Sequence, residues 1–245
     1  MSYTAVVPAR WASSRFPGKP LVDLGGVPMV VRTASRAHEA RSVDRVIVAT
    51  DDERIVEVCE AHDIETFLTR AGHTTGTDRV VEASERLRIE RIVNVQGDEP
   101  LIEPGTIDRV VDGLEEDDGS EVANAGCPLE AVDTEDPNVV KVVGNENGRV
   151  LYISRSPVPF SWDEPAPRLR HLGLYAFRGG ALKTFALHSQ GPVELAERIE
   201  MFRFLERGYP ITLVEVPVGP PAVDTPEDVD RIDRFADEHG GWPDV

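Results

Sequence analysis

Short apolar runs alternate with amphipathic stretches through the first half of the chain. The runs have the length of buried strands, and we predict strands at 3–8, 45–51, 64–68 and 91–100, where the last ends in a loop. The stretches between and after them predict helices at 27–39, 52–62, 76–88 and 104–114. Strands that alternate with helices in this way form parallel βαβ units with both sheet faces covered. We therefore expect an α/β fold with a mostly parallel, Rossmann-like sheet.

The pattern changes after the acidic segment 115–121. From there to residue 178 the apolar stretches are β-like, and turns rather than helices separate them. The sequence then predicts a helix at 193–206, a strand at 211–216 and an amphipathic helix at 226–238. We expect one domain over residues 1–245, in which residues 120–180 form a β-rich subdomain.

Charge and cysteine content narrow the classes of partner. The 44 acidic residues exceed the 26 basic ones, and the resulting net charge of −18 repels nucleic acid and anionic lipid. No apolar stretch reaches the length of a signal peptide core or a membrane span. Cys59 and Cys127 stand far apart and outside any metal-binding spacing. We expect a cytoplasmic protein with neither a nucleic-acid nor a membrane partner.

The segment 8–21, PARWASSRFPGKPL, joins a predicted strand to a predicted helix. Cations and small hydroxyl residues gather in it, namely Arg10, Ser13, Ser14, Arg15 and Lys19. Such side chains, together with exposed backbone N–H groups and the close approach that Gly18 permits, suit phosphate binding. The segment matches neither GxxxxGK[ST] nor GxGxxG. The alternative interpretation is an ordinary βα loop with surface cations.

Two aspartates stand on loops next to predicted elements. Asp98 follows a buried strand in VQGDEP, and Asp224 precedes the last helix in AVDTPED. A hard divalent ion such as Mg²⁺ takes one or two carboxylates and completes its shell with phosphate and water. The alternative is that Asp98 belongs to a turn and that Asp224 caps the helix.

Seven further motifs accompany the loop at 8–21. This loop resembles the signature of sugar nucleotidyltransferases, and most closely the PARxxSTRxPGKPL pattern of the 3-deoxy-manno-octulosonate cytidylyltransferases, with Ser14 in the threonine position. The other motifs occur in that family's order over nearly the whole chain: RVIVATDD, TRAGHTTGTDR, IVNVQGDEP, PNVVKVV, YISRSPVPF, RHLGLYAFR and VDTPEDVDR. NVQGDEP and VDTPED are the most specific of them.

The resemblance implies a nucleotidyltransferase fold and an activity. CMP would pass from CTP to the anomeric hydroxyl of a 2-keto-3-deoxy sugar acid, most simply 3-deoxy-manno-octulosonate (octulosonate below), with release of pyrophosphate. Mg²⁺ would bind Asp98 and Asp224, and the β-rich region would pair two chains into a homodimer. Arg10, Arg15 and Lys19 would hold the triphosphate as catalytic residues, and Ser13 and Ser14 would contribute to nucleotide binding. The implied base pocket comprises Ala9, Arg10, Thr75, Gly76 and Gln96. The implied sugar pocket comprises Arg155, His171, Tyr175, Glu200 and Met201.

The chain departs from the family pattern at one position of the base pocket and at one of the sugar pocket, and the second departure leaves the acceptor sugar open. Thr75 takes a serine position in the H-x-S-G-T motif, and Met201 stands where the family has glutamine. A methionine cannot replace the hydrogen bonds of an amide, although it is also a common core residue. Alternatives that remain are another ulosonic acid such as an acylneuraminate, another nucleotide, or a nucleotide-binding protein without catalysis.

Overall fold

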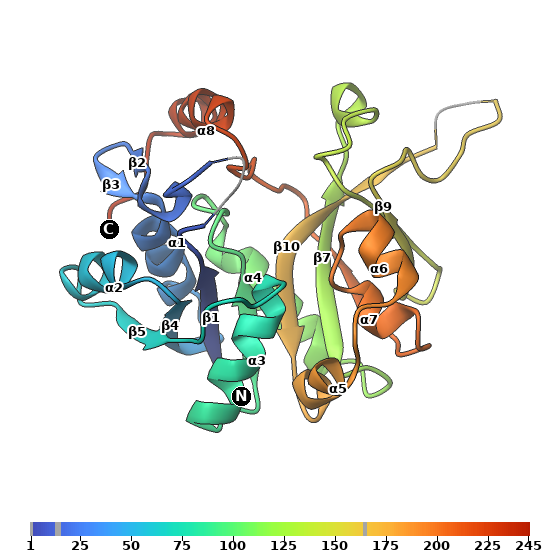
Figure 1. Cartoon of the computed structure of the whole chain (residues 1–245). Helices are drawn as coiled ribbons and strands as arrows, with labels where there is room; N and C mark the ends of the chain where they lie inside the picture. Colours follow the sequence, from blue (N-terminus) through green and yellow to red (C-terminus); the bar gives the residue numbers. More distant parts are fainter. Residues whose placement is uncertain (1, 13–15, 164–165) are drawn as a thin grey trace. The chain divides into compact units, whose positions relative to one another are not determined.

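The structure is a computed structural model that describes residues 2–12, 16–163 and 166–245. The chain divides into two compact units (Figure 1). Unit 1 comprises Met1–Asp108 and Pro220–Val245, and unit 2 comprises Arg109–Gly219. The β-rich segment 120–180 that the sequence predicts falls within unit 2. None of the described helices is long and apolar enough to span a membrane.

Unit 1 contains a parallel sheet in the order β6-β1-β4-β5. Its strands are β1 (Tyr3–Ala9), β4 (Val43–Thr50), β5 (Glu65–Leu68) and β6 (Ile92–Val95). Every residue of the inner strand β1 is buried, which explains its unbroken apolar sequence. The helices are α1 (Met29–His38), α2 (Glu53–Glu60), α3 (Gly76–Leu87) and α8 (Glu227–Glu238). This arrangement confirms the predicted α/β class with a mostly parallel sheet.

The start of the first helix was predicted too early. Val27–Pro28 form strand β3, which pairs with β2 (Asp23–Leu24), and α1 begins only at Met29. The reason is local, because a proline disfavours helical backbone in the residue before it. The short helix η1 (Lys19–Leu21) lies just before this hairpin.

The C-terminal segment returns to unit 1 and packs against its N-terminal part. Ile232 and Ala236 of α8 share a core cluster with Leu24 and Met29, so α8 lies beside the β2–β3 hairpin (Figure 1). Val223 belongs to the same cluster and is fully buried. Residues at opposite ends of the sequence are thereby held together by apolar packing.

Helix α4 (Pro104–Glu115) carries the chain from unit 1 into unit 2. In unit 2, β7 (Val122–Pro128) pairs in parallel with β11 (Thr212–Glu215) and antiparallel with β10 (Leu169–Phe177). The antiparallel strands β8 (Lys141–Gly144) and β9 (Val150–Ser154) extend this sheet from β10. The helical elements of unit 2 are η2 (Ala131–Asp133), α5 (Ala181–Leu187), α6 (Pro192–Glu197) and α7 (Phe202–Leu205).

The predicted continuous helix at 193–206 is wrong. Helix α6 ends at Glu197, Arg198 adopts a left-handed conformation with φ of 54°, and α7 begins at Phe202. No glycine or proline marks the break. At the break the carbonyl of Glu197 instead accepts a hydrogen bond from Arg155 Nε at 2.7 Å, a contact from a distant part of the sequence. In a continuous helix that carbonyl would accept the N–H four residues later.

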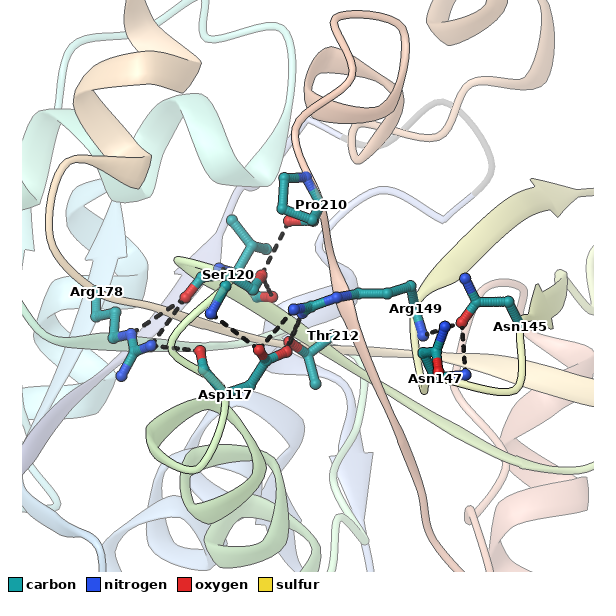
Figure 2. Close-up of polar contacts among 10 residues, drawn as sticks. Asp117, Ser120, Asn145, Asn147, Arg149, Arg178, Pro210 and Thr212 are labelled. Carbon is teal, nitrogen blue, oxygen red and sulfur yellow. Dashed lines mark hydrogen bonds and ion pairs between the residues drawn. The ribbon is translucent and has the colours of Figure 1, made fainter.

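The acidic segment 115–121 anchors several parts of unit 2 (Figure 2). The carboxylate of Asp117 accepts hydrogen bonds from the Arg149 guanidinium, one of them at 2.5 Å, and from Thr212 Oγ1 at 2.6 Å. Arg178 donates to the backbone carbonyls of Asp117 and Ser120 at 2.5 and 3.0 Å. The segment thus joins the end of α4 to β10 and β11, and Asp117 is held by the fold rather than only solvated.

Candidate active site

Lys19 brings the two predicted metal carboxylates together in unit 1. Its Nζ atom lies 2.7 Å from Asp98 Oδ2 and 3.5 Å from Asp224 Oδ1, and it donates to the Val223 carbonyl at 2.8 Å. The side chain of Lys19 is only 15% exposed, against 29% for Asp98 and 32% for Asp224. Three loop motifs that are far apart in the sequence therefore converge on one ammonium group.

The local backbone places Lys19 at this position. Gly18 precedes η1 with φ of 73°, a left-handed conformation that L residues rarely adopt. A Cβ atom there would also lie 3.0 Å from the ring of Trp11. The conformation thus favours glycine, and a side chain there would also require the Trp11 ring to shift. Burial by itself lowers the pKa of Lys19, but the charges and hydrogen bonds of Asp98 and Asp224 outweigh it, so the pKa is raised and the side chain stays cationic.

Hydrogen bonds hold the Asp224 loop in place. Asp228, in the first turn of α8, accepts from the backbone N–H of Asp224 at 2.9 Å and of Thr225 at 2.7 Å. The N–H of Val223 donates to the Asp98 carbonyl at 3.0 Å, which joins the two aspartate loops directly. The carboxylate of Asp228 therefore binds the backbone of the loop, whereas the carboxylates of Asp98 and Asp224 contact Lys19.

The two carboxylates are donors of the type that a hard divalent ion prefers. Both contact the same ammonium, so their oxygens face a common point. Across the described ranges, no group of three or more His, Cys, Asp or Glu side chains is arranged to hold a metal ion. Two carboxylates completed by phosphate and water suit Mg²⁺, which seldom occupies an all-protein cage.

Two of the predicted base-binding residues of unit 1, Gly76 and Gln96, lie side by side. A Cβ atom at Gly76 would fall 3.0 Å from Gln96 Oε1, so the first residue of α3 lies directly against this amide. Thr75 is the N-cap of α3 and forms a reciprocal capping box with Asp78. Ala9 is buried at the end of β1, and Arg10 after it is exposed. Ser13, Ser14 and Arg15 lie outside the described residues.

Trp11 of the segment 8–21 stacks with Arg54, a contact that sequence reasoning missed. The Arg54 guanidinium lies 3.4 Å from the Trp11 ring centroid and donates two hydrogen bonds to Asp52, at 2.8 and 2.6 Å. Asp52 in turn is the N-cap of α2, at the residue where the sequence predicts this helix to begin. A cation stacked on an aromatic ring is attractive, but no spacing rule pairs residue 11 with residue 54.

Three of the predicted sugar-binding residues gather in unit 2. Tyr175 Oη lies 3.3 Å from His171 Nε2, and both residues belong to β10. Burial and then the positive charge of Arg155 lower the pKa of His171 to about 3. His171 is therefore a neutral imidazole near Arg155 at physiological pH, able to exchange hydrogen bonds but carrying no charge.

Glu200 and Met201 lie in the break between α6 and α7 rather than on a continuous helix. Glu200 is half-buried, and Met201 is fully buried. The burial of Met201 favours the alternative interpretation of this residue as part of the core. Sequence reasoning also missed Glu197, which binds Arg155 and its neighbour; this pairing depends on tertiary contact and has no signal in the sequence.

Comparisons with known proteins agree on one family. The family model described as cytidylyltransferase matches residues 4–213. The 3-deoxy-manno-octulosonate cytidylyltransferase of Syntrophotalea carbinolica is 46% identical over 244 residues, which cover 95% of this chain and 98% of the relative. A protein of the same name from Polynucleobacter necessarius subsp. necessarius is 43% identical over 94% of each chain.

Solved structures extend the likeness to three dimensions. A CMP:2-keto-3-deoxy-manno-octonic acid synthetase complexed with CTP matches with a TM-score of 0.91 and 35% identity, covering 98% of this chain and all of that one. A 4-diphosphocytidyl-2C-methyl-D-erythritol synthase from Anaerococcus prevotii matches with a TM-score of 0.61 at 15% identity. The second likeness concerns the fold alone.

Proposed function

This chain belongs to the cytidylyltransferase family, and we propose that it transfers CMP from CTP to the anomeric hydroxyl of octulosonate, releasing pyrophosphate. The observation that carries the proposal is the convergence of Lys19, Asp98 and Asp224 within unit 1. Nucleotidyl transfer needs this combination, because the triphosphate must be held by cations and a metal must be held by carboxylates.

Each part of unit 1 has a role in this mechanism. The Lys19 ammonium and the exposed Arg10 bind phosphate oxygens and offset the negative charge that the reaction concentrates there. The amide of Gln96, next to Gly76, can both donate to and accept from the edge of cytosine. Mg²⁺ held by Asp98 and Asp224 would supply a Lewis acid for the phosphate and the attacking hydroxyl. No covalent enzyme intermediate is needed.

Unit 2 supplies the residues for the acceptor. The Arg155 guanidinium can bind a sugar carboxylate with two parallel hydrogen bonds. The neutral imidazole of His171 and the hydroxyl of Tyr175 can form hydrogen bonds with the hydroxyl groups of the sugar ring without adding charge to the site. Since Met201 is fully buried, it offers no polar contact in place of the family's glutamine, and the acceptor needs a direct test.

A pyrophosphate-release assay tests the proposal. With CTP and Mg²⁺, we expect turnover with octulosonate to exceed turnover with other ulosonic acids and with an acylneuraminate. UTP or GTP in place of CTP should give little product. Faster release with another acid would correct the acceptor and keep the reaction class. Absence of release with every acid would favour nucleotide binding without catalysis.

We also propose that the chain forms a homodimer through unit 2. Phe160 and Trp162 are 78% and 87% exposed, and their rings meet edge to face with centroids 6.0 Å apart. Leu151 and Tyr152 of β9 are exposed as well. An exposed pair of aromatic rings in mutual contact is typical of an interaction surface.

Light scattering at micromolar concentration should report a dimer in both low and high salt, since apolar burial is not screened. Trp162→Ser should shift the equilibrium toward monomer. Leu187→Ser is the matched control, because Leu187 is 81% exposed on α5, away from this cluster in the sequence, and should leave the mass unchanged. A wild-type monomer under both conditions would reject the assembly.

A further inference from the structure

The Arg155 side chain is held on two sides by backbone carbonyls of unit 2. Its Nε donates to the Glu197 carbonyl at 2.7 Å, and its Nη1 donates to the Pro137 carbonyl at 2.8 Å. A guanidinium is planar, so two anchored N–H groups set the direction of the whole fork. Arg155 is therefore oriented by the fold and not only tethered by its flexible stem.

Glu197 also holds the backbone from which Arg155 extends. One carboxylate oxygen, Oε2, accepts from the Arg155 backbone N–H at 2.9 Å. The other, Oε1, accepts from Ser154 Oγ at 2.8 Å. Hydrogen bonds to a carboxylate are stronger than those between neutral groups. The main chain and side chain of Arg155 are thus both bound to a single residue.

The backbone of α6 is shaped to make these contacts. The helix ends at Glu197 because Arg198 turns left-handed, with φ of 54°, and its N–H donates to the Glu194 carbonyl at 2.8 Å. A residue with a Cβ atom adopts this conformation at a cost. The break frees the Glu197 carbonyl for Arg155. Strained backbone that persists beside a candidate binding residue is an observation that points to function.

Buried Lys141 secures the opposite side of the same turn. Its Nζ donates to the Asp136 carbonyl at 2.7 Å and to the Arg155 carbonyl at 3.3 Å, and the residue is fully buried. Pro137, whose carbonyl binds the Arg155 fork, directly follows Asp136. The segments 136–137 and 154–155 and the end of α6 therefore form one hydrogen-bonded frame around Arg155.

We infer that Glu197 is a positioning residue, which orients Arg155 to bind the carboxylate of the acidic sugar with both arms of its fork. This inference rests on the function proposed above. A bidentate arginine–carboxylate pair depends on the angle of the guanidinium plane, so a fixed Arg155 discriminates an acid from its neutral analogue. Glu197 contacts Arg155 and not the substrate.

Steady-state kinetics of Glu197→Ala and Glu197→Gln test the inference. In the alanine variant the KM for octulosonate should rise about tenfold or more. The Glu197 carboxylate is then lost, and with it the hydrogen bonds that it accepts from Ser154 Oγ and from the Arg155 backbone N–H. The KM for CTP should stay within about twofold of the wild type, since CTP binding does not use this carboxylate. Glutamine keeps the length and one acceptor oxygen, so its effect should be smaller. Glu130→Ala, at an exposed position of unit 2, is the matched control and should change neither KM.

The carboxamide analogue of octulosonate separates positioning from general damage. The wild type should prefer the acid over the amide, and Glu197→Ala should lose most of that preference while its turnover of the amide stays unchanged. Equal losses with acid and amide would mean that Glu197 only stabilises unit 2, and the inference would fail. If the alanine variant keeps the wild-type KM and preference, the inference also fails, although the proposed function stands.

An NMR measurement tests the inference even if no acid is a substrate and the proposed function is wrong. The Nε–H resonance of Arg155, assigned through its disappearance in Arg155→Lys, reports the bond to the Glu197 carbonyl. Alanine keeps this backbone carbonyl and removes only the carboxylate that holds the Arg155 backbone N–H, so the resonance should shift and broaden in Glu197→Ala but not in Glu130→Ala. An unchanged resonance would show that the Glu197 carboxylate does not orient the guanidinium and would overturn the inference independently of activity.

Discussion

Asp98→Asn and Asp224→Asn should each reduce CMP transfer by about a hundredfold or more, because each removes a negative charge and a carboxylate ligand from the proposed Mg²⁺ site. Both carboxylates contact the Lys19 ammonium. The two loops that carry them are joined by the hydrogen bond from the Val223 N–H to the Asp98 backbone carbonyl. The substitution keeps side-chain size, so the fold should survive. Turnover at limiting Mg²⁺, with the near-ultraviolet circular dichroism spectrum of each variant, measures the effect.

Asp44→Asn is the matched control for this experiment. Asp44 is an exposed aspartate in β4 of the same unit and should have little effect on turnover. Partial recovery of the two site variants at high Mg²⁺ would agree with a weakened metal site. A near-wild-type rate for either variant at limiting Mg²⁺ would contradict the assignment of that carboxylate.

Glu194→Ala should destabilise unit 2 by about 3–5 kcal/mol, because it leaves a buried guanidinium without its carboxylate. Glu194 and Arg203 are 1% and 5% exposed, and two hydrogen bonds join them, at 2.6 Å from Nη2 and at 3.1 Å from Nε. The Arg203 guanidinium also lies 3.9 Å from the Phe185 ring centroid. Urea unfolding should report a lower midpoint with an unchanged slope.

An exposed ion pair and a double variant complete this test. Glu65→Ala removes the partner of Arg45 on the surface of unit 1, where a pair of this kind contributes about 0–1 kcal/mol. Glu194→Leu combined with Arg203→Met should be less destabilising than Glu194→Ala alone, because neither charge then remains buried. A similar midpoint shift for Glu194→Ala and Glu65→Ala would show that burial of the first pair has no energetic consequence.

Much of unit 1 could be predicted because its signals are local. A strand buried on both faces is apolar throughout, as β1 is, and a helix start carries its own cap, as Asp52 does for α2. The motifs of Lys19, Asp98 and Asp224 could be recognised one at a time for the same reason. Their meeting at one ammonium group required the packing of α8 against the N-terminal segment.

Unit 2 was harder to predict because contacts between distant residues decide its details. The pattern over 193–206 is helical, yet Arg155 takes the Glu197 carbonyl and the helix breaks. The acidic segment 115–121 has the composition of a solvated linker, yet Asp117 binds Arg149 and Thr212. Periodicity describes neighbours along the chain, so it cannot anticipate a hydrogen bond that a distant arginine or threonine supplies.

The sequence by itself determined the α/β class, the order of the main-sheet strands and helices in unit 1 apart from the β2–β3 hairpin, and the residues that the family motifs identify. It did so because hydrophobic period, capping and turn chemistry act over a few residues. Only the tertiary structure decided that Asp98 and Asp224 share one ammonium, that Met201 is buried and that Glu197 holds Arg155. These arrangements depend on which distant surfaces pack together, and the free energy of that packing is distributed over the whole chain.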